Sequence, residues 1–151
     1  MTHRQIIDYC LNKAGAYLDY PFNPVVPVVK VKAPSMDKGR IFAQPFILRG
    51  KPKVTLNCTP ASAEYYRHIY DGAVTRGYHC PPIQQPHFNT VDLDSTVPDE
   101  EILHMIDHAY AVSVSKLPKY AQRELSKYPK QGNSDGDKNK KLNSNERRRK
   151  T

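Results

Sequence analysis

The 151-residue chain lacks the features that would mark a membrane-spanning, secreted or disulfide-stabilised protein. No segment approaches the roughly 18 consecutive apolar residues that a membrane span requires. Residues 2–5 are polar, and the N-terminal segment carries no apolar signal region. The three cysteines, Cys10, Cys58 and Cys80, form no CxxC pair, which disfavours a disulfide framework and fits a reducing compartment. We therefore expect a cytoplasmic protein with no membrane partner.

Signatures of catalysis and cofactor binding are also missing. The chain contains neither a GxGxxG nor a GxxxxGK[ST] phosphate-binding loop. His104 and His108 share a helix face, but they lack the glutamate of an HExxH site and an evident third ligand. Cys80 lies beside His79, yet neighbours on an extended chain point to opposite sides, and no orienting group is apparent. We expect no catalytic residues, no metal, no cofactor and no enzymatic activity.

The last 21 residues, 131–151, differ in composition from the rest of the chain. Leu142 is their one large apolar residue, so they cannot bury enough surface to offset the entropy of ordering, and we predict a disordered tail. The tail and residues 1–130 each contribute +4 to the net charge of +8, and the tail ends in the run Arg147–Lys150. Such a run either attracts polyanions or serves only as a solvated tail.

Three segments carry the signals of amphipathic helices. The first runs from a capping box at Thr2 to about Ala14, the second begins at Thr59, and the third runs from Pro98 to about Lys116. Three acids fill the first turn of the third helix, where the helix dipole favours negative charge. Buried stripes are expected at Ala61, Tyr65 and Ile69 in the second helix and at Ile102, Met105, Ile106 and Ala109 in the third.

Segments of alternating polarity predict an antiparallel sheet of four to five strands. The predicted strands comprise residues 28–32, 40–48, 53–58 and 88–93, with a further short strand considered at Tyr78–His79. Pro45 cannot donate a ladder hydrogen bond, so the strand at 40–48 is expected to be an edge strand, or to be bulged or broken there. Residues 17–27 are expected to be irregular. Short turns and interspersed helices predict an α+β fold with the helices packed on one face.

Several segments of residues 1–120 resemble the MmcQ/YjbR family of small bacterial proteins. The matching segments are Ile7–Leu11, Gly15–Tyr17, Asp19–Phe22, Leu56–Cys58, Gly77–His79, His87–Val91, Val97–Glu101, Met105–Asp107 and Leu117–Lys119. The resemblance implies a CyaY-like fold and a DNA-binding function that uses two β wings. The resemblance covers nearly all of residues 1–120, which we take as a YjbR-like domain, followed by a C-terminal extension at 121–130 and the tail that composition assigns to 131–151.

Charge is unevenly distributed within the domain. Between Val28 and Lys53 there are seven basic residues and one acid, a net +6, whereas Val91 to Asp107 contains six acids and no lysine or arginine. Basic residues beside turns can contact a phosphate backbone, although lysines on edge strands also prevent aggregation. The candidate nucleic-acid contacts are Lys30, Lys32, Lys38, Arg40, Arg49, Lys51 and Lys53, together with His87, Phe88 and Asn89.

We therefore expect a monomer that binds DNA mainly through backbone contacts. Phe88 could stack on a base, but an aromatic residue in such a position is more often packed under a helix or loop. The alternative function is a non-catalytic adaptor that docks a protein partner on an edge strand or on the aromatic stretch Tyr17–Phe22. Steep salt dependence would favour nucleic-acid binding over an apolar protein interface.

Overall fold

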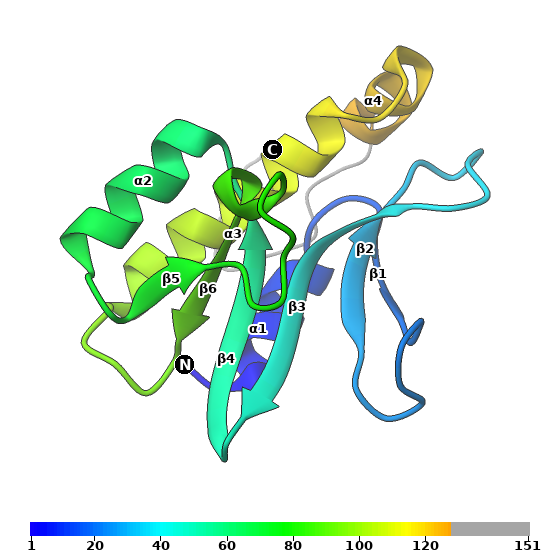
Figure 1. Cartoon of the computed structure of the whole chain (residues 1–151). Coiled ribbons are helices and arrows are strands. Elements are labelled where there is room, and N and C mark those ends of the chain that lie inside the picture. Colours follow the sequence, from blue (N-terminus) through cyan, green and yellow to red (C-terminus); the bar gives the residue numbers. More distant parts are fainter. Residues whose placement is uncertain (128–151) are drawn as a thin grey trace, which may run out of the picture.

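The computed structural model describes residues 1–127 as an α+β domain in which one antiparallel sheet is covered by helices (Figure 1). The six strands are ordered β1-β2-β3-β4-β6-β5, which confirms the predicted fold class and adds β1 and β5 to the predicted strands. The elements are α1 (His3–Leu11), β1 (Ala16–Asp19), β2 (Val28–Val31), β3 (Arg40–Leu48), β4 (Lys51–Asn57), α2 (Pro60–Ile69), β5 (Val74–Arg76), the 3₁₀ turn η1 (Gln85–His87), β6 (Phe88–Asp92), α3 (Asp99–Ser115) and α4 (Lys119–Ser126).

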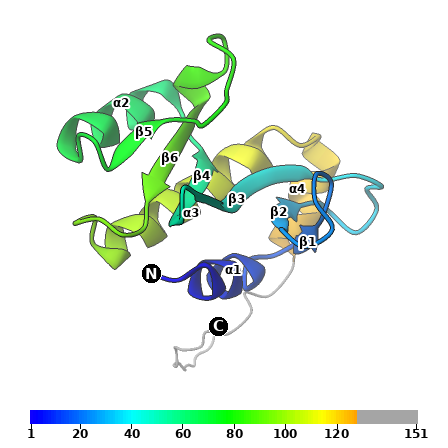
Figure 2. The same ribbon diagram turned by 60° about the horizontal axis from the view of Figure 1, so that its bottom comes forward.

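The helices pack on one face of the sheet, as Figures 1 and 2 both show. Helix α3 contacts β2, β3 and β4, whereas α1 contacts β1 and β2, and α2 contacts β5 and β6. The core lies between these layers, where removal of apolar side chains from water stabilises the fold. Its largest fully buried side chains include Phe42, Ile6, Leu56, Ile102 and Ile106.

Local sequence signals explain how α1 and α3 form. Thr2 accepts a hydrogen bond from the Gln5 N–H, and the Gln5 side chain accepts one from the Thr2 N–H, so the predicted capping box is present. Helix α3 has three acids in its first turn, as expected from the helix dipole. Its predicted stripe is buried at Ile102, Met105, Ile106 and Ala109.

The predicted orientation of α2 is wrong. Ala61, Tyr65 and Ile69 are exposed, and Ala63 is the buried residue of this helix. The inward face also carries Arg67, whose Nε donates to the Asn89 side-chain oxygen at 2.6 Å. Two stripes of similar polarity run along this ten-residue helix, and the polar anchor to β6 determines which of them faces the sheet.

Strand β3 is an interior strand over its first half and an edge over its second half. It pairs with β2 only as far as Ala43, while its pairing with β4 continues to the turn. Pro45 therefore does not break the strand. It lies in the half of β3 that is an edge, whereas the other half is interior. The irregularity in this region falls instead between Val29 and Lys30 in the β2–β3 pairing.

The geometry of β4 shows which way the nitrogen of Pro45 points. The Pro52 carbonyl accepts from the Leu93 N–H, so the peptide groups of Pro52 point toward β6 and away from β3. In an antiparallel ladder, positions two residues apart point the same way, so the facing pair Pro45–Val54 also carries no bonds between β3 and β4. The Pro45 nitrogen thus points toward the free side of β3, where no donor is required.

Helix α4 extends the fold beyond the domain boundary expected at residue 120. Ala121 and Leu125 lie in the hydrophobic core, and the Leu125 side chain lies so close to Gly15 that a Cβ atom there would approach it to 2.5 Å. Ser35 of the β2–β3 loop donates its backbone N–H to Glu124 at 3.2 Å. The predicted disordered tail, residues 131–151, lies outside the described residues.

Candidate nucleic-acid interface

The seven predicted cations divide into two groups at opposite ends of β3. The first group lies on β2, the loop that leads into β3 and the first residue of β3, and comprises Lys30, Lys32, Lys38 and Arg40. The second group lies on the β3–β4 turn and the start of β4, and comprises Arg49, Lys51 and Lys53. Strand β3 has nine residues, and at about 3.3 Å per residue its two ends are roughly 25–30 Å apart. The basic segment of the sequence is therefore not one compact patch.

Three of these cations are already engaged within the domain. Lys30 Nζ lies 2.7 Å from Asp19, and Lys53 Nζ lies 3.6 Å from Asp92, both across neighbouring strands. The hydrogen bond from Lys30 holds the pKa of Asp19 below its ordinary value. Lys32 lies 5.2 Å from the centre of the Tyr17 ring, so its charge is partly satisfied by a cation–π contact.

The other four cations are exposed, and within residues 1–127 none of them forms an ion pair. They are Lys38, Arg40, Arg49 and Lys51. Arg49 and Gly50 form the β3–β4 turn with φ angles of 51° and 78°, the left-handed pair that a two-residue hairpin turn requires. This geometry presents Arg49 at the tip, with Lys51 directly after the turn. These four residues are the ones free to meet phosphates.

The face of the sheet opposite the helices joins the two basic ends, and we call it the open face. Gln44, Thr55 and Thr90 are aligned across β3, β4 and β6 on this face. Thr55 and Thr90 share a hydrogen bond of 2.7 Å and are buried, because the segment after β5 crosses above them. The Tyr78 N–H donates to Thr90 Oγ1 at 2.9 Å and fixes that crossing.

An aromatic cluster lies in the middle of the open face. The rings of Phe46 and Tyr78 stack with centroids 5.4 Å apart, and His79 packs against Tyr78 at 4.0 Å. A turn from Gly77 to Cys80 places them, with His79 at a φ of 60°. A side chain at Gly77 would approach Cys80 Sγ to 2.6 Å, so glycine is needed there. The short strand considered at Tyr78–His79 is therefore this turn.

The segment His87–Asn89 does not form one surface. His87 is exposed, Phe88 is half-buried beside Gly77, and Asn89 is buried with only 3 % of its surface exposed. The Asn89 side chain accepts from Arg67 and donates to the Ala63 carbonyl at 3.3 Å, so it faces the helices. Alternation along β6 thus separates these residues between the two sides of the sheet.

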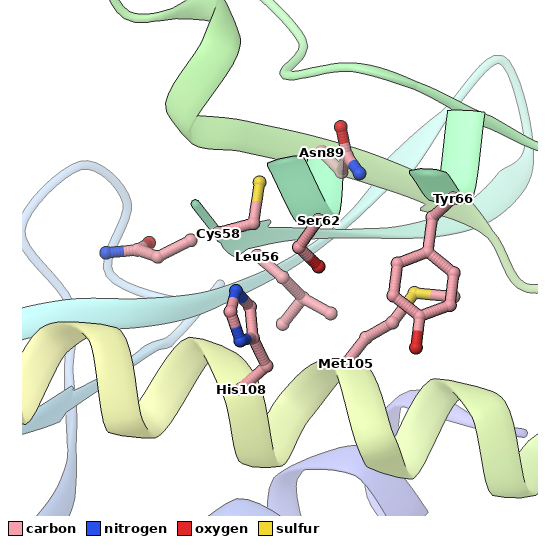
Figure 3. A pocket seen from close by; sticks show the side chains of 8 residues that line it. Leu56, Cys58, Ser62, Tyr66, Asn89, Met105 and His108 are labelled. Carbon is pink, nitrogen blue, oxygen red and sulfur yellow. The ribbon is translucent and has the colours of Figure 1, made fainter. Parts of the chain in front are cut away.

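A small cavity lies between α2, α3 and the end of β4 (Figure 3). Its volume of about 10 Å³ suits one water molecule and is far below that of a ligand pocket. Burial raises the pKa of the Cys58 thiol to about 11 and lowers the pKa of His108. His108 Nε2 accepts a hydrogen bond from the Thr59 N–H at 3.1 Å, so its role here is to cap α2.

The two histidines of α3 have different partners. His104 Nδ1 lies 3.4 Å from Glu101, one turn earlier on the same helix, whereas His108 contacts the start of α2. Among residues 1–127, no group of three His, Cys, Asp or Glu side chains is arranged to hold a metal ion. At Cys80, burial raises the pKa of the thiol, which is opposite to the shift that activates a nucleophile.

The fold and surface define a small α+β domain with a helix-covered sheet face, an open face, and exposed cations at both ends of β3. The YjbR family model matches residues 11–112, and the chain belongs to this family. The uncharacterised YjbR protein of Escherichia coli K12 is 27 % identical over 125 residues, which cover 83 % of this chain and 98 % of that protein.

Two solved structures share the architecture. A crystal structure of the Deinococcus radiodurans protein DR2400, a DUF419 domain, superposes with a TM-score of 0.72 at 26 % identity and covers 83 % of this chain and 88 % of that one. A Pseudomonas syringae protein superposes with a TM-score of 0.60 at 21 % identity, covering 75 % of this chain and 99 % of that chain. The second similarity concerns the fold alone.

Proposed function

We propose that this domain binds nucleic acid, DNA in particular, without catalysing a reaction, by placing the phosphate backbone along β3 on the open face. The observation that carries the proposal is the set of four exposed cations, Lys38, Arg40, Arg49 and Lys51, at the two ends of one strand with no acidic partner among residues 1–127. Lysine and arginine side chains release condensed counterions when they neutralise phosphates, which supplies sequence-independent affinity.

The separation of the two basic ends suits an extended polyanion better than a small anion. A B-form duplex carries phosphates along its whole length, and a span of roughly 25–30 Å corresponds to about eight base pairs at 3.4 Å per pair. Family membership adds support only through the DNA-binding role that resemblance to this family implies. The Phe46–Tyr78 stack between the basic ends offers an apolar surface for sugar or base contacts.

The test is an electrophoretic mobility shift on random duplex DNA at two salt concentrations. The tail would contribute affinity of its own, so the background protein has Arg147, Arg148, Arg149 and Lys150 replaced by glutamine in the full-length chain. In that background, Arg49→Glu with Lys51→Glu is expected to abolish the shift. Lys38→Glu with Arg40→Glu is expected to weaken it about tenfold or more and to reduce the salt slope by about one unit for each contact removed.

Arg123→Glu is the matched control for the turn reversal, because Arg123 is an exposed arginine on α4, which contacts the β2–β3 loop at the end of β3 opposite the β3–β4 turn. Lys53 is unsuitable for charge reversal, since its ion pair with Asp92 links β4 to β6 and its loss would disturb the sheet. Equal behaviour of the turn reversal and the Arg123 control, or no shift by the background protein at low salt, would refute the proposal.

A second candidate function is protein docking on the outer face of α2. The exposed stripe Ala61, Tyr65 and Ile69 favours it, since apolar residues four apart on a helix form a continuous contact line. Binding of that kind would persist at high salt, whereas phosphate contacts would not. Tyr65→Ser with Ile69→Ser would abolish docking and leave the DNA mobility shift unchanged.

A further inference from the structure

The β1–β2 loop, residues 20–27, carries the largest group of exposed apolar side chains near one position in the chain. Phe22 is 76 % exposed and Val25 is 78 % exposed, while Tyr20 and Val26 are 46 % and 41 % exposed. Single exposed apolar residues are normal on a protein surface, but four within one loop are a feature of contact sites. Neither the fold nor the proposed phosphate contacts require them.

The backbone of this loop has few unpaired N–H groups. Three of its eight residues are prolines and have no N–H. The Tyr20 N–H donates to the Asp19 carboxylate at 2.8 Å, and the N–H groups of Val25 and Val26 donate to Asn23 Oδ1 at 2.7 and 3.2 Å. Three of the five backbone N–H groups in this loop are thus paired within the chain. Transfer of unpaired peptide donors out of water is costly, so this pairing lowers the cost of burying the loop.

The β3–β4 turn is a second projecting tip at the same end of the sheet as the β1–β2 loop. Strands β2 and β3 are antiparallel, so the loop before β2 and the turn after β3 lie at the same end, as Figures 1 and 2 show. The β3–β4 turn places Ile47, 67 % exposed, two residues before Arg49. Apolar side chains on both tips are therefore accompanied by two free cations, Arg49 and Lys51.

We propose that these two tips form a peripheral membrane-binding site for anionic lipid. Phe22, Val25 and Ile47 would enter the boundary between headgroups and acyl chains, while Arg49 and Lys51 contact lipid phosphates. Tyr20, at the base of its loop, has the amphipathic ring that favours the interface. A bilayer surface can accept both loop tips at once. A base step in DNA accepts only one inserted side chain, and a protein partner would need a pocket for each tip.

This site differs from a membrane span. No helix within residues 1–127 is long and apolar enough to cross a bilayer. The expectation of no membrane partner rested on the absence of such a segment, and a peripheral contact does not need one. The lipid site shares Arg49 and Lys51 with the proposed DNA surface, but Phe22 and Val25 belong to the lipid site alone.

A fluorescence experiment can place the loop relative to the bilayer directly, because the chain contains no tryptophan. Phe22→Trp is mixed, as full-length protein, with vesicles of equal parts phosphatidylcholine and phosphatidylglycerol. Its emission is expected to shift to the blue and to be quenched by lipids brominated on the acyl chain. Ile83→Trp is the matched control, because Ile83 is 84 % exposed and lies in the connection at the opposite end of the sheet.

Vesicle sedimentation then measures the contribution of the apolar tip. Phe22→Asp with Val25→Asp is expected to lower vesicle binding at least about tenfold, whereas Ile83→Asp changes it less than about twofold. Lys38→Glu with Arg40→Glu should weaken DNA binding about tenfold or more but retain vesicle binding. This variant therefore distinguishes a failure of the lipid proposal from a failure of the DNA proposal.

Four results would overturn the lipid site. The first is a wild-type protein that does not bind the anionic vesicles. The second is Phe22→Asp/Val25→Asp protein that binds them like wild type, which would assign binding to the basic tail. The third is equal quenching of tryptophan fluorescence in the Phe22→Trp and Ile83→Trp variants. The fourth is a loss of DNA binding in the aspartate variant without loss of vesicle binding, which would assign the loop to DNA instead.

Discussion

The two faces of the sheet use the same strands for different purposes. On the covered face, Phe42 is fully buried and packs edge-on against Tyr110 of α3 at 5.4 Å. On the open face, Phe46 of the same strand is half-buried and stacks on Tyr78, which a turn brings across the sheet. The covered face gains stability from burial of apolar side chains, whereas the open face combines two buried, hydrogen-bonded threonines with an aromatic stack that is only half-buried.

The strongest test of this difference is a matched pair of substitutions on β3. Phe42→Ala is expected to lower the free energy of unfolding by about 3–5 kcal/mol, because it leaves a cavity in the core. Phe46→Ala is expected to lower it by about 1–2 kcal/mol, mainly through loss of one aromatic pair. Urea denaturation measures both, and equal losses would show that the open face is packed as tightly as the core.

A polar cluster on the covered side gives the next largest effect. Asp107 of α3 accepts hydrogen bonds from Tyr9 at 2.8 Å and from Lys13 at 2.6 Å, which links α1 to α3. Asp107→Asn is expected to cost about 1–2 kcal/mol in urea denaturation, since its carboxylate is half-exposed. Asp8→Asn removes only the exposed pair with Arg4 and is expected to cost less than about 0.5 kcal/mol. A similar loss from both variants would contradict this distinction.

His108 makes the covered side sensitive to acid. Burial lowers its folded-state pKa below the ordinary value of 6.5, and its Nε2 must be unprotonated to accept from Thr59. Below about pH 6.5 the unfolded chain binds a proton that the folded chain resists, so the stabilising contribution of His108 is present above that pH and decreases as pH falls. His108→Gln should reduce the loss of stability between about pH 7.5 and pH 5, measured by urea denaturation, whereas His104→Gln should not.

The smallest effect is expected on the outer surface of the helix layer. Tyr65→Ser and Ile69→Ser are each predicted to change the free energy of unfolding by no more than about 0.5 kcal/mol, because both side chains are about half-exposed. Thermal unfolding measures this directly. A loss of several kcal/mol would mean that this stripe is covered, as the sequence first suggested.

The sequence predicted an element correctly where its polarity pattern was long and residues typical of a helix or strand end marked its bounds. Helix α3 combines a seventeen-residue amphipathic pattern with an acidic first turn, so its bounds and buried stripe were both predictable. Strand β1 was missed because it is only four residues long and leads into the proline-rich loop. Helix α4 was missed because its core contribution rests on two residues, Ala121 and Leu125.

The sequence predicted which basic residues belong to the candidate interface, but not which of them are free of ion pairs within the domain. The partners of Lys30 and Lys53 are Asp19 and Asp92, which are brought together by strand register rather than by closeness in sequence. A count of charges cannot show that these two lysines are engaged. The strand predicted at residues 40–48 has the bounds of β3, so the location of the remaining cations at its two ends did follow from the sequence.

The free half of β3 also affects how one molecule meets another. A strand with one unpaired side is a template on which a second chain can add a strand and begin to aggregate. Pro45 lies in that half with its nitrogen toward the unpaired side and is itself buried, so this position offers an incoming strand no backbone donor. Pro45 thus leaves the β3–β4 ladder intact and removes one donor from the unpaired side of β3, where a second copy would have to pair.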